Sequence, residues 1–350
     1  MFEERKKRTE ISELGEFRLI DIITRDIKIY NKSTEKGVGD DAAILHYSEN
    51  EKVLVSTDLL AEGIHFHLSY VPLKHLGYKA AMVNFSDIAA MNALPKQMTV
   101  SLALSNRFSL EAVEELYSGI KLACDKHQVD LIGGDTTSST SGLMISITVL
   151  GTAKKDKIVE RTGAQDKDLL VTTGDLGAAY AGLLLLERER KVFEKTPGVQ
   201  PDLAGYEYLL ERQLKPEARL DIVKKFEDLG IIPTSMIDIS DGLASEILHL
   251  CKESKVGCHL YEDKIPIDVQ THQVAESFNM HPVTLPLNGG EDYQLLFTVS
   301  QENFKKIEND ASFTVIGHMM DEATGAQMIT NADTAIPLQA QGWDGLKKQD

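Results

Sequence analysis

Gly37-Val38-Gly39-Asp40-Asp41 is the first of five short acidic phrases that indicate how this 350-residue chain folds and what it binds. The others are Ser-Thr-Asp at 56–58, Asn-Phe-Ser-Asp at 84–87, Gly-Gly-Asp-Thr-Thr at 133–137 and Asp-Ile-Ser-Asp-Gly at 238–242. A single aspartate of this kind usually caps a helix or starts a turn. Carboxylates repeated beside small hydroxyl residues are instead typical of a site for hard Mg²⁺ ions that also hold phosphates. The phrases therefore predict a Mg²⁺-dependent enzyme acting on a phosphorylated nucleotide.

The net charge of the chain argues against two classes of partner. With 37 Lys and Arg residues against 54 Asp and Glu residues, the formal charge is −17 at pH 7. Nonspecific binding to nucleic acid needs Lys and Arg side chains that replace counterions on the phosphates, and an anionic membrane surface attracts basic segments. We therefore expect neither nucleic acid nor a membrane as a partner. A strongly acidic protein that binds phosphates needs added positive charge, which divalent metal ions supply.

The cysteines and the first ten residues indicate the cellular compartment of the protein. Cys124, Cys251 and Cys258 form neither a disulfide framework nor a zinc-ligand spacing. The opening decapeptide MFEERKKRTE is charged and lacks the apolar stretch of a signal peptide. The longest apolar run, around 182–186, is far too short to span a bilayer. The sequence therefore predicts a cytoplasmic protein.

Hydrophobic periodicity predicts alternating strands and helices up to about residue 150. The segments 42–47 and 52–60 are expected to pair as a hairpin across the turn SENEK, and Ser109 is expected to cap a helix that reaches about His127. The remaining elements are helices at 16–27 and about 73–93, and strands at 98–104, 129–135 and 143–151. In this pattern the acidic phrases mostly lie where strands stop.

A lysine-rich stretch at 152–164 is expected to join two domains, 1–152 and 153–350, because a chain of this length favours two domains over one. Beyond the junction, residues 168–187 predict a strand, a glycine turn and a buried helix, and residues 191–205 predict a loop or short insertion. Further expected elements are a helix at 242–254 and strands at 236–240, 258–261 and 288–300.

The glycines at 37–42 match the dinucleotide pattern G-x-G-x-x-A, but the context excludes that fold. The pattern must follow a strand and open a helix whose amides face a pyrophosphate. Here a polar loop precedes it, a strand-like run follows it, and Asp40 and Asp41 stand where the pyrophosphate would lie. The P-loop motif G-x-x-x-x-G-K-[ST] and the protein-kinase motifs are also absent from the sequence.

Four further residues have both a structural and a functional interpretation. His67 is either a hydrogen-bonded loop histidine or a metal ligand, whereas the acidic phrase beside His65 favours contact with substrate. Glu291 follows two glycines, which form either a simple turn or a close approach of backbone and carboxylate to a ligand. Arg161 is either an ordinary surface arginine or a partner for a phosphate.

The order and spacing of these phrases resemble the thiamine-monophosphate kinase family over nearly the whole chain. The matching segments are GEFRLI, GVGDDAAIL, STDLLAEGIHF, YKAAMVNFSDIAAMNALP, LIGGDTT, RTGA, IDISDGL and GGEDYQLLFT. This family belongs to the aminoimidazole-ribonucleotide-synthetase-like superfamily. The resemblance implies a two-domain α/β (α+β) PurM-like fold and a homodimer. In it, domain 1–152 builds the dimer and binds metal and ATP, and domain 153–350 closes over the nucleotide.

The dimer also has support from the sequence pattern itself. The expected strands at 52–60 and 98–104 are largely apolar on both faces, which suits burial against a second subunit.

By resemblance, the site residues fall into three groups. The metal-binding positions are Asp41, Ser56, Thr57, Asp58, Asp87, Asp135, Asp238 and Asp241. The ATP contacts are Gly134, Asp135, Arg161 and Ser240, and the substrate contacts are His65, Glu291 and Trp343. Trp343 stands where many relatives carry tyrosine, which keeps an aromatic face.

The implied reaction transfers the γ-phosphoryl group of ATP, with several Mg²⁺ ions, to thiamine monophosphate and yields thiamine diphosphate and ADP. The acceptor is a phosphate oxygen that is already deprotonated near neutral pH, so no residue is expected as general acid or base. We expect direct in-line transfer without a phosphoenzyme. Another ATP-dependent enzyme of the superfamily, a metal-dependent phosphohydrolase and a non-catalytic nucleotide sensor are the alternatives. Selenophosphate synthetase would need a reactive cysteine near the N-terminus, and none precedes Cys124.

Overall fold

The computed structural model describes residue 9 and residues 16–38 and 43–341. Asp41 and Trp343, two of the expected site residues, lie outside this part of the chain. The chain divides into two compact units, of which unit 1 comprises Met1–Ile88 and Pro95–Thr152 and unit 2 comprises Ala89–Leu94 and Ala153–Asp350. Within the described residues, no helix is both long enough and apolar enough to cross a membrane.

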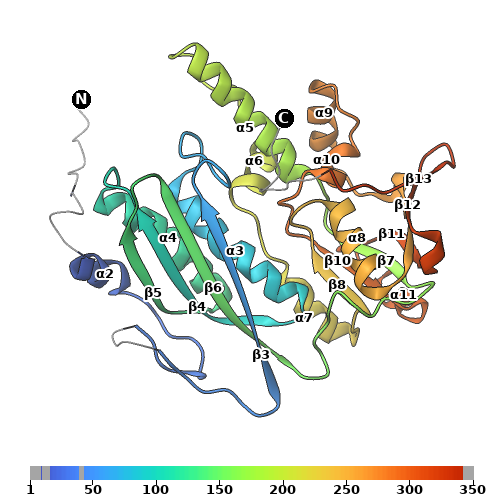
Figure 1. Ribbon diagram of the computed structural model, residues 1–350, viewed down its shortest axis with the longest axis horizontal. Coiled ribbons are helices and arrows are strands. Elements are labelled where there is room, and N and C mark those ends of the chain that lie inside the picture. The colour runs from blue at the N-terminus through green and yellow to red at the C-terminus, as the bar shows by residue number, and fades with distance from the viewer. Residues whose placement is uncertain (1–8, 10–15, 39–42, 342–350) are drawn as a thin grey trace. The chain divides into compact units, whose positions relative to one another are not determined.

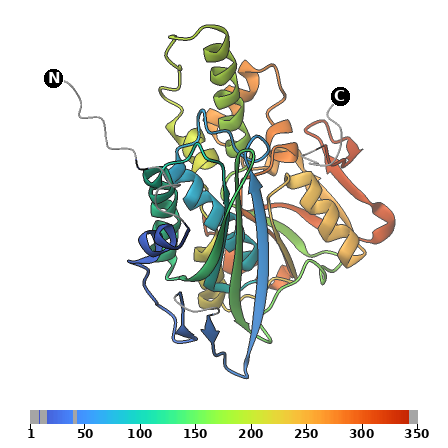
Figure 2. The same cartoon turned by 60° about the vertical axis from the view of Figure 1, so that its left-hand side comes forward.

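Unit 1 is built on a four-stranded sheet with helices on one face (Figures 1 and 2). In spatial order its strands are β3 (Glu51–Ala61), β6 (Leu143–Lys154), β4 (Leu94–Leu104) and β5 (Asp130–Ser138), and β4 and β5 run parallel. The helices are α2 (Glu16–Thr24), α3 (Leu73–Ala90) and α4 (Leu110–His127).

Strand β3 shows why one face of this sheet is covered and the other is open. Side chains alternate between the two faces of a strand. Leu54 and Leu60 are buried, at 8% and 5% exposure, whereas Val53, Val55 and Leu59 are 41%, 65% and 56% exposed. The even-numbered residues of β3 therefore face the helical layer, and the odd-numbered ones form an open apolar face.

The expected hairpin between 42–47 and 52–60 is wrong. The short strand β2 (Ile44–Leu45) pairs antiparallel with β1 (Thr34–Lys36) in a separate two-stranded sheet, and β3 instead neighbours β6. The sequence shows that two strands flank a turn, but the partner of β3 is about 90 residues away and leaves no local signal.

The helix cap at Ser109 is confirmed. The Ser109 hydroxyl accepts a hydrogen bond from the amide of Ala112 at 3.4 Å, and α4 ends at His127, as expected. Beyond it, Gln128 adopts the left-handed conformation, with φ of 56°, and its amide bonds the carbonyl of Cys124.

Unit 2 is built on a seven-stranded mixed sheet. In spatial order its strands are β13 (Ala335–Pro337), β12 (Ala326–Ile329), β9 (Gly257–Tyr261), β11 (Phe313–Met320), β7 (Leu169–Thr173), β10 (Leu295–Val299) and β8 (Ser235–Asp238). Its helices are α5 (Ala178–Lys195), α6 (Glu207–Leu214), α7 (Leu220–Leu229), α8 (Leu243–Ser254), α9 (Val269–Ser277), α10 (Thr284–Asn288) and α11 (Phe304–Ile307).

Strand β10 illustrates how both faces of this sheet are buried. Leu296 belongs to the hydrophobic cluster that includes Ile247 of α8. The next residue, Phe297, packs edge-on against Phe226 of α7, with ring centroids 5.0 Å apart. Helices α8 and α7 therefore cover opposite faces, which explains why all five residues of β10 are buried.

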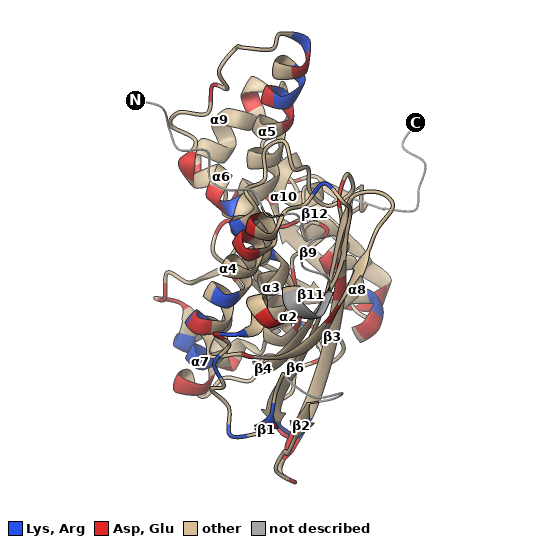
Figure 3. Ribbon diagram, turned by 90° about the vertical axis from the view of Figure 1, so that its left-hand side faces the viewer, with Lys and Arg blue, Asp and Glu red and all other residues tan. Residues whose placement is uncertain are grey.

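The expected loop at 191–205 begins later than predicted, because α5 continues to Lys195. Arg190 pairs with Glu187 (Nη2–Oε2, 2.6 Å) and with Glu194 (Nη1–Oε1, 2.7 Å) at helical spacing, and this end of α5 carries both signs of charge (Figure 3). Such exposed pairs extend a helix whose apolar face has ended. Overall, the chain has the mixed α/β class that the sequence predicts.

We expect Ser109→Ala to lower the free energy of unfolding by about 1 kcal/mol, because the amide of Ala112 loses its capping acceptor. Ser118→Ala in the middle of the same helix is the control, since alanine is the better helix former there. Chemical denaturation measures both. Equal effects of the two substitutions would show that the cap contributes nothing specific.

Candidate functional site

Two carboxylates from separate acidic phrases come together in unit 1. Asp58 lies on the helix-facing side of β3, and its backbone amide donates to the Asn84 side-chain oxygen on α3 at 3.1 Å. One turn further along α3 lies Asp87, which accepts a hydrogen bond from the Ser56 hydroxyl. Residues 56 and 58 share a face of β3, and residues 84 and 87 share a face of α3, so strand and helix are joined at this point.

The negative charges of Asp58 and Asp87 act unfavourably on each other. Burial and, as a smaller effect, the negative charge of Asp87 together raise the pKa of Asp58 to about 6. A bound cation reverses both effects. Mg²⁺ typically uses one or two carboxylates and completes its shell with water and substrate phosphates, and this pair fits that requirement.

The side chain of Thr57 does not contact Asp58 or Asp87, because its hydroxyl bonds to the neighbouring strand. Its hydroxyl donates to the carbonyl of Ile147 at 3.1 Å and accepts from the Thr148 hydroxyl at 3.0 Å. Both partners belong to β6, and Thr57 lies with Val55 on the open face of the sheet. A metal contact by Thr57 would have to use its backbone carbonyl.

Gly134 and Asp135 lie inside the edge strand β5 and are exposed. A Cβ atom on Gly134 would lie 2.0 Å from the carbonyl oxygen of Val100, so only glycine fits beside β4 here. The expectation that acidic phrases mostly mark strand ends is wrong for two of them, because residues 133–137 and 56–58 lie within strands. Residues 84–87 lie within α3, in agreement with the helix expected at about 73–93.

The two histidines after β3 lie in a turn rather than on an extended segment. The His65 Nδ1 atom accepts from the amide of Ala61 at 3.0 Å, and its ring is exposed. His67 contacts the Ser69 hydroxyl through Nδ1 at 2.7 Å and stacks on Tyr70. His67 is thus a hydrogen-bonded loop histidine, whereas His65 remains accessible to a substrate.

In unit 2 the phrase 238–242 runs from the end of β8 into α8. Asp238 is buried, while Ser240 is partly exposed and Asp241 is exposed. The loop is held from behind by Glu246, whose Oε1 atom accepts from the amides of Asp241 (2.8 Å) and Ser240 (3.1 Å). These bonds hold the backbone amides of residues 240 and 241 against Glu246, while the Asp241 side chain remains exposed.

Glu246 is a functional-site residue that the sequence analysis missed. It is 2% exposed, and its Oε2 atom has no hydrogen-bond partner among the described residues. Burial raises the pKa of Glu246 to about 8, and the charges of Asp241 and Asp238 act in the same direction. The sequence feature that could have identified Glu246 is its position as an acidic residue in the first turn of a predicted helix.

Glu291 lies in a loop that runs beside the phrase 238–242. Its amide donates to the carbonyl of Ser240 at 2.7 Å, and the amide of Tyr293 donates to the carbonyl of Ile239 at 2.9 Å. Gly290 cannot be replaced, because a Cβ atom would lie 2.4 Å from the Ser240 oxygen and its φ is 69°. The glycines therefore serve the close approach of two backbones as well as a turn.

Arg161 is exposed in unit 2, and its carbonyl accepts from the Ser254 hydroxyl at 3.2 Å. Burial raises the pKa of Asp241, and His249 and Arg161 act in the opposite direction through their charge. Arg161 is thus close enough to act on the acidic phrase.

No group of three or more His, Cys, Asp or Glu side chains with the geometry of a metal site occurs among the described residues. Within unit 1 the structure brings together Ser56, Asp58 and Asp87, and within unit 2 it brings Asp238, Ser240 and Asp241 beside Glu291. Asp41 falls outside the described residues.

Comparisons with known proteins agree on one family. Residues 39–153 match the family model of AIR synthase related protein, N-terminal domain. The thiamine-monophosphate kinase of Aquifex aeolicus is 36% identical over 294 residues, which are 84% of this chain and 89% of that protein. The solved structure of AaThiL complexed with AMPPCP and TMP has a TM-score of 0.70 at 32% identity and covers 96% of this chain and 98% of its own.

A crystal structure of thiamine-monophosphate kinase from Stenotrophomonas maltophilia has a TM-score of 0.76 at 30% identity, over 91% of this chain and 98% of its own. The resemblance that the acidic phrases suggest is therefore confirmed over most of the sequence and for the fold. The chain belongs to the thiamine-monophosphate kinase family.

Proposed function

We propose that this protein transfers the γ-phosphoryl group of ATP to the phosphate of thiamine monophosphate, giving thiamine diphosphate and ADP. The observation that carries the proposal is the neighbouring pair of partly buried carboxylates, Asp58 and Asp87, which lies on elements whose sequences match the family. The AaThiL relative was solved with AMPPCP and TMP, which supports a nucleotide and a phosphate ester as the two substrates. A requirement for ATP supports a cytoplasmic location.

The residues present fit Mg²⁺ as the required metal. Asp58 and Asp87 would hold a metal ion in unit 1, with Asp41 and Asp135 as further metal ligands, and Asp238 and Asp241 would bind metal in unit 2. When bound, the metal would relieve the repulsion between the two polyanionic substrates. Ser56 holds the Asp87 carboxylate in place by its hydrogen bond, and Thr57 would contribute a backbone oxygen.

The protein's own side chains would bind and orient the substrates, because the acceptor phosphate oxygen is already deprotonated near neutral pH. We propose direct in-line transfer, with no phosphoenzyme and no general base. Gly134, Arg161 and Ser240 would contact ATP. His65, Glu291 and Trp343 would contact thiamine monophosphate, the indole through its attraction for the cationic thiazolium ring.

The test is incubation with ATP, Mg²⁺ and thiamine monophosphate, followed by chromatography for thiamine diphosphate and an assay for free phosphate. We expect thiamine diphosphate in step with ADP. Phosphate released from ATP without thiamine diphosphate would instead identify a phosphohydrolase, and no turnover would favour a nucleotide sensor.

In the same assay, Asp58→Asn and Asp87→Asn should each reduce kcat at least about a hundredfold, because a lost carboxylate removes charge stabilisation of the transition state. The control is Asp125→Asn, an exposed aspartate of α4 paired with Lys28 (Nζ–Oδ2, 3.3 Å). Near-normal turnover of either site variant at ordinary Mg²⁺ concentration would remove that residue from the metal site.

We also propose that the protein is a homodimer formed through the open face of the unit 1 sheet. Val53, Val55 and Leu59 of β3, together with Met144 of β6 at 42% exposure, give that face the apolar character of an interface. A two-fold dimer would bury the same patch on both subunits.

Val55→Asp should convert the dimer to a monomer, as measured by light scattering at micromolar concentration. Val269→Asp is the matched control, because Val269 is 68% exposed on α9 and Val55 is 65% exposed. A wild-type protein that is monomeric and fully active would contradict the proposal, as would a Val55→Asp variant that remains dimeric.

A further inference from the structure

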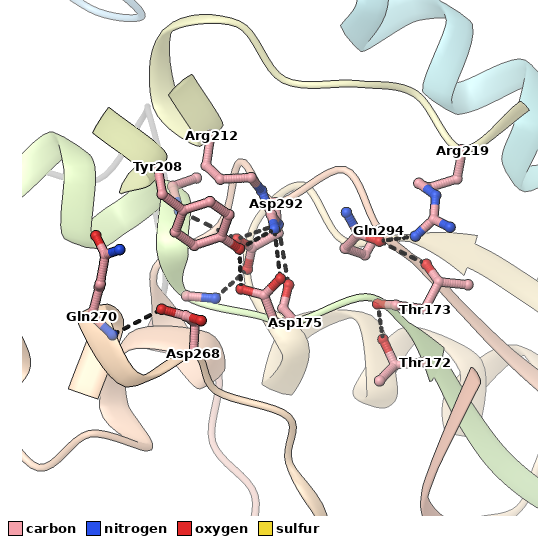
Figure 4. Close-up of polar contacts among 12 residues, drawn as sticks. Thr172, Thr173, Asp175, Tyr208, Arg212, Arg219, Asp268, Gln270, Asp292 and Gln294 are labelled. Atoms are coloured by element: carbon pink, nitrogen blue, oxygen red, sulfur yellow. Dashed lines mark hydrogen bonds and ion pairs between the residues drawn. The ribbon is translucent and has the colours of Figure 1, made fainter. Parts of the chain in front are cut away.

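Arg212 of α6 forms a fork between two carboxylates in unit 2 (Figure 4). Its Nη1 atom donates to Asp175 Oδ1 at 2.8 Å, and its Nη2 atom lies 3.5 Å from Asp292 Oδ1. Tyr208, one turn earlier on α6, accepts from Arg212 at 2.9 Å and donates to Asp175 Oδ2 at 2.6 Å. The Arg212 side chain is only 16% exposed, so these contacts are shielded from water.

Asp292, the second carboxylate, is 1% exposed and joins three segments. Its Oδ2 atom accepts from the amide of Gly177 at 2.7 Å, and its Oδ1 atom accepts from the amide of Ala179 at 3.4 Å. These are free amides of the first turn of α5, where a negative charge is favourable. Asp292 therefore fixes its loop to the start of α5, and Arg212 fixes it to α6.

The loop that Asp292 holds is conformationally strained. Its neighbours Glu291 and Tyr293 both have left-handed backbone conformations, with φ of 59° and 49°. Residues other than glycine adopt this backbone conformation at a cost in free energy. The conformation persists only where surrounding contacts hold it in place. Here the contacts are the two backbone bonds to residues 239 and 240 and the buried network around Asp292.

The same helix also holds Glu291 directly. Gln213, the residue after Arg212, donates through Nε2 to Glu291 Oε2 at 2.6 Å and is 6% exposed. Two consecutive residues of α6 thus hold two consecutive residues of the loop. The position of the Glu291 carboxylate is set by α6 rather than by its own loop.

We propose that Arg212 is a positioning residue that holds Glu291 in place for the thiamine portion of the substrate. This inference rests on the proposed function, in which Glu291 contacts thiamine monophosphate. Arg212 does not touch the substrate itself. It acts by joining Asp175 and Asp292, so that the strained loop keeps one conformation.

Arg212→Lys is the decisive substitution, because lysine keeps the charge but a single ammonium group lacks the planar fork that spans both carboxylates. We expect the KM for thiamine monophosphate to rise about tenfold or more, since a displacement of about 1 Å in a positioning group has large effects. The KM for ATP should stay unchanged. Amide hydrogen exchange at Glu291 and Tyr293 should become faster.

Arg219→Lys is the matched control. Arg219 is also 16% exposed and lies in the same region, where it donates to Gln294 at 2.6 Å (Figure 4). It also pairs with Asp221 at 2.9 Å. It should alter neither the substrate KM nor exchange at residues 291 and 293. In a Glu291→Ala background, Arg212→Lys should raise the substrate KM no further, because residues that act through one another are not additive.

A lower melting temperature of Arg212→Lys with an unchanged substrate KM would show a merely structural arginine and would overturn the proposal. Unchanged exchange at 291 and 293 would overturn it as well. A wild-type protein that makes no thiamine diphosphate would refute the proposed function instead. In that case, the exchange measurement still decides whether Arg212 holds the loop.

Discussion

Repulsion between neighbouring, partly buried carboxylates is the constraint on which the arrangement of unit 1 depends. Asp58 and Asp87 are placed on facing sides of β3 and α3, where burial and mutual charge raise the pKa of Asp58 to about 6. Two apolar residues would pack at these positions without the electrostatic cost. The cation site that we propose would explain such a pair, and a loss of stability is the usual cost of a functional site.

Unit 2 also contains buried carboxylates, but they are held in place by different contacts. Glu246 is buried behind Asp238 and Asp241, and its carboxylate fixes the amides of the loop that carries them. Asp292 is likewise buried, but the start of α5 and Arg212 supply its positive partners. Glu246 therefore fixes its loop through backbone amides alone, whereas Asp292 fixes its loop through backbone amides and an arginine.

What the sequence predicts well is local in the chain. The bond between Ser109 and Ala112 spans three residues, and a capping residue before an amphipathic run is sufficient to locate it. The partner of β3 was predicted wrongly because pairing with β6 joins segments about 90 residues apart. The site shows the same limit, since the order of the acidic phrases indicates the family, whereas the fork of Arg212 between residues 175 and 292 has no signal in either segment.

The most direct test of the central claim is thermal unfolding of the wild type and Asp58→Asn, each with and without Mg²⁺ and a nonhydrolysable ATP analogue. If Asp58 is held beside Asp87 for the sake of a cation, the variant without metal should melt at a higher temperature than the wild type. Mg²⁺ and the nucleotide should then stabilise the wild type but not the variant. A variant that melts lower without metal, and gains as much stability from Mg²⁺ and nucleotide as the wild type does, would contradict the account.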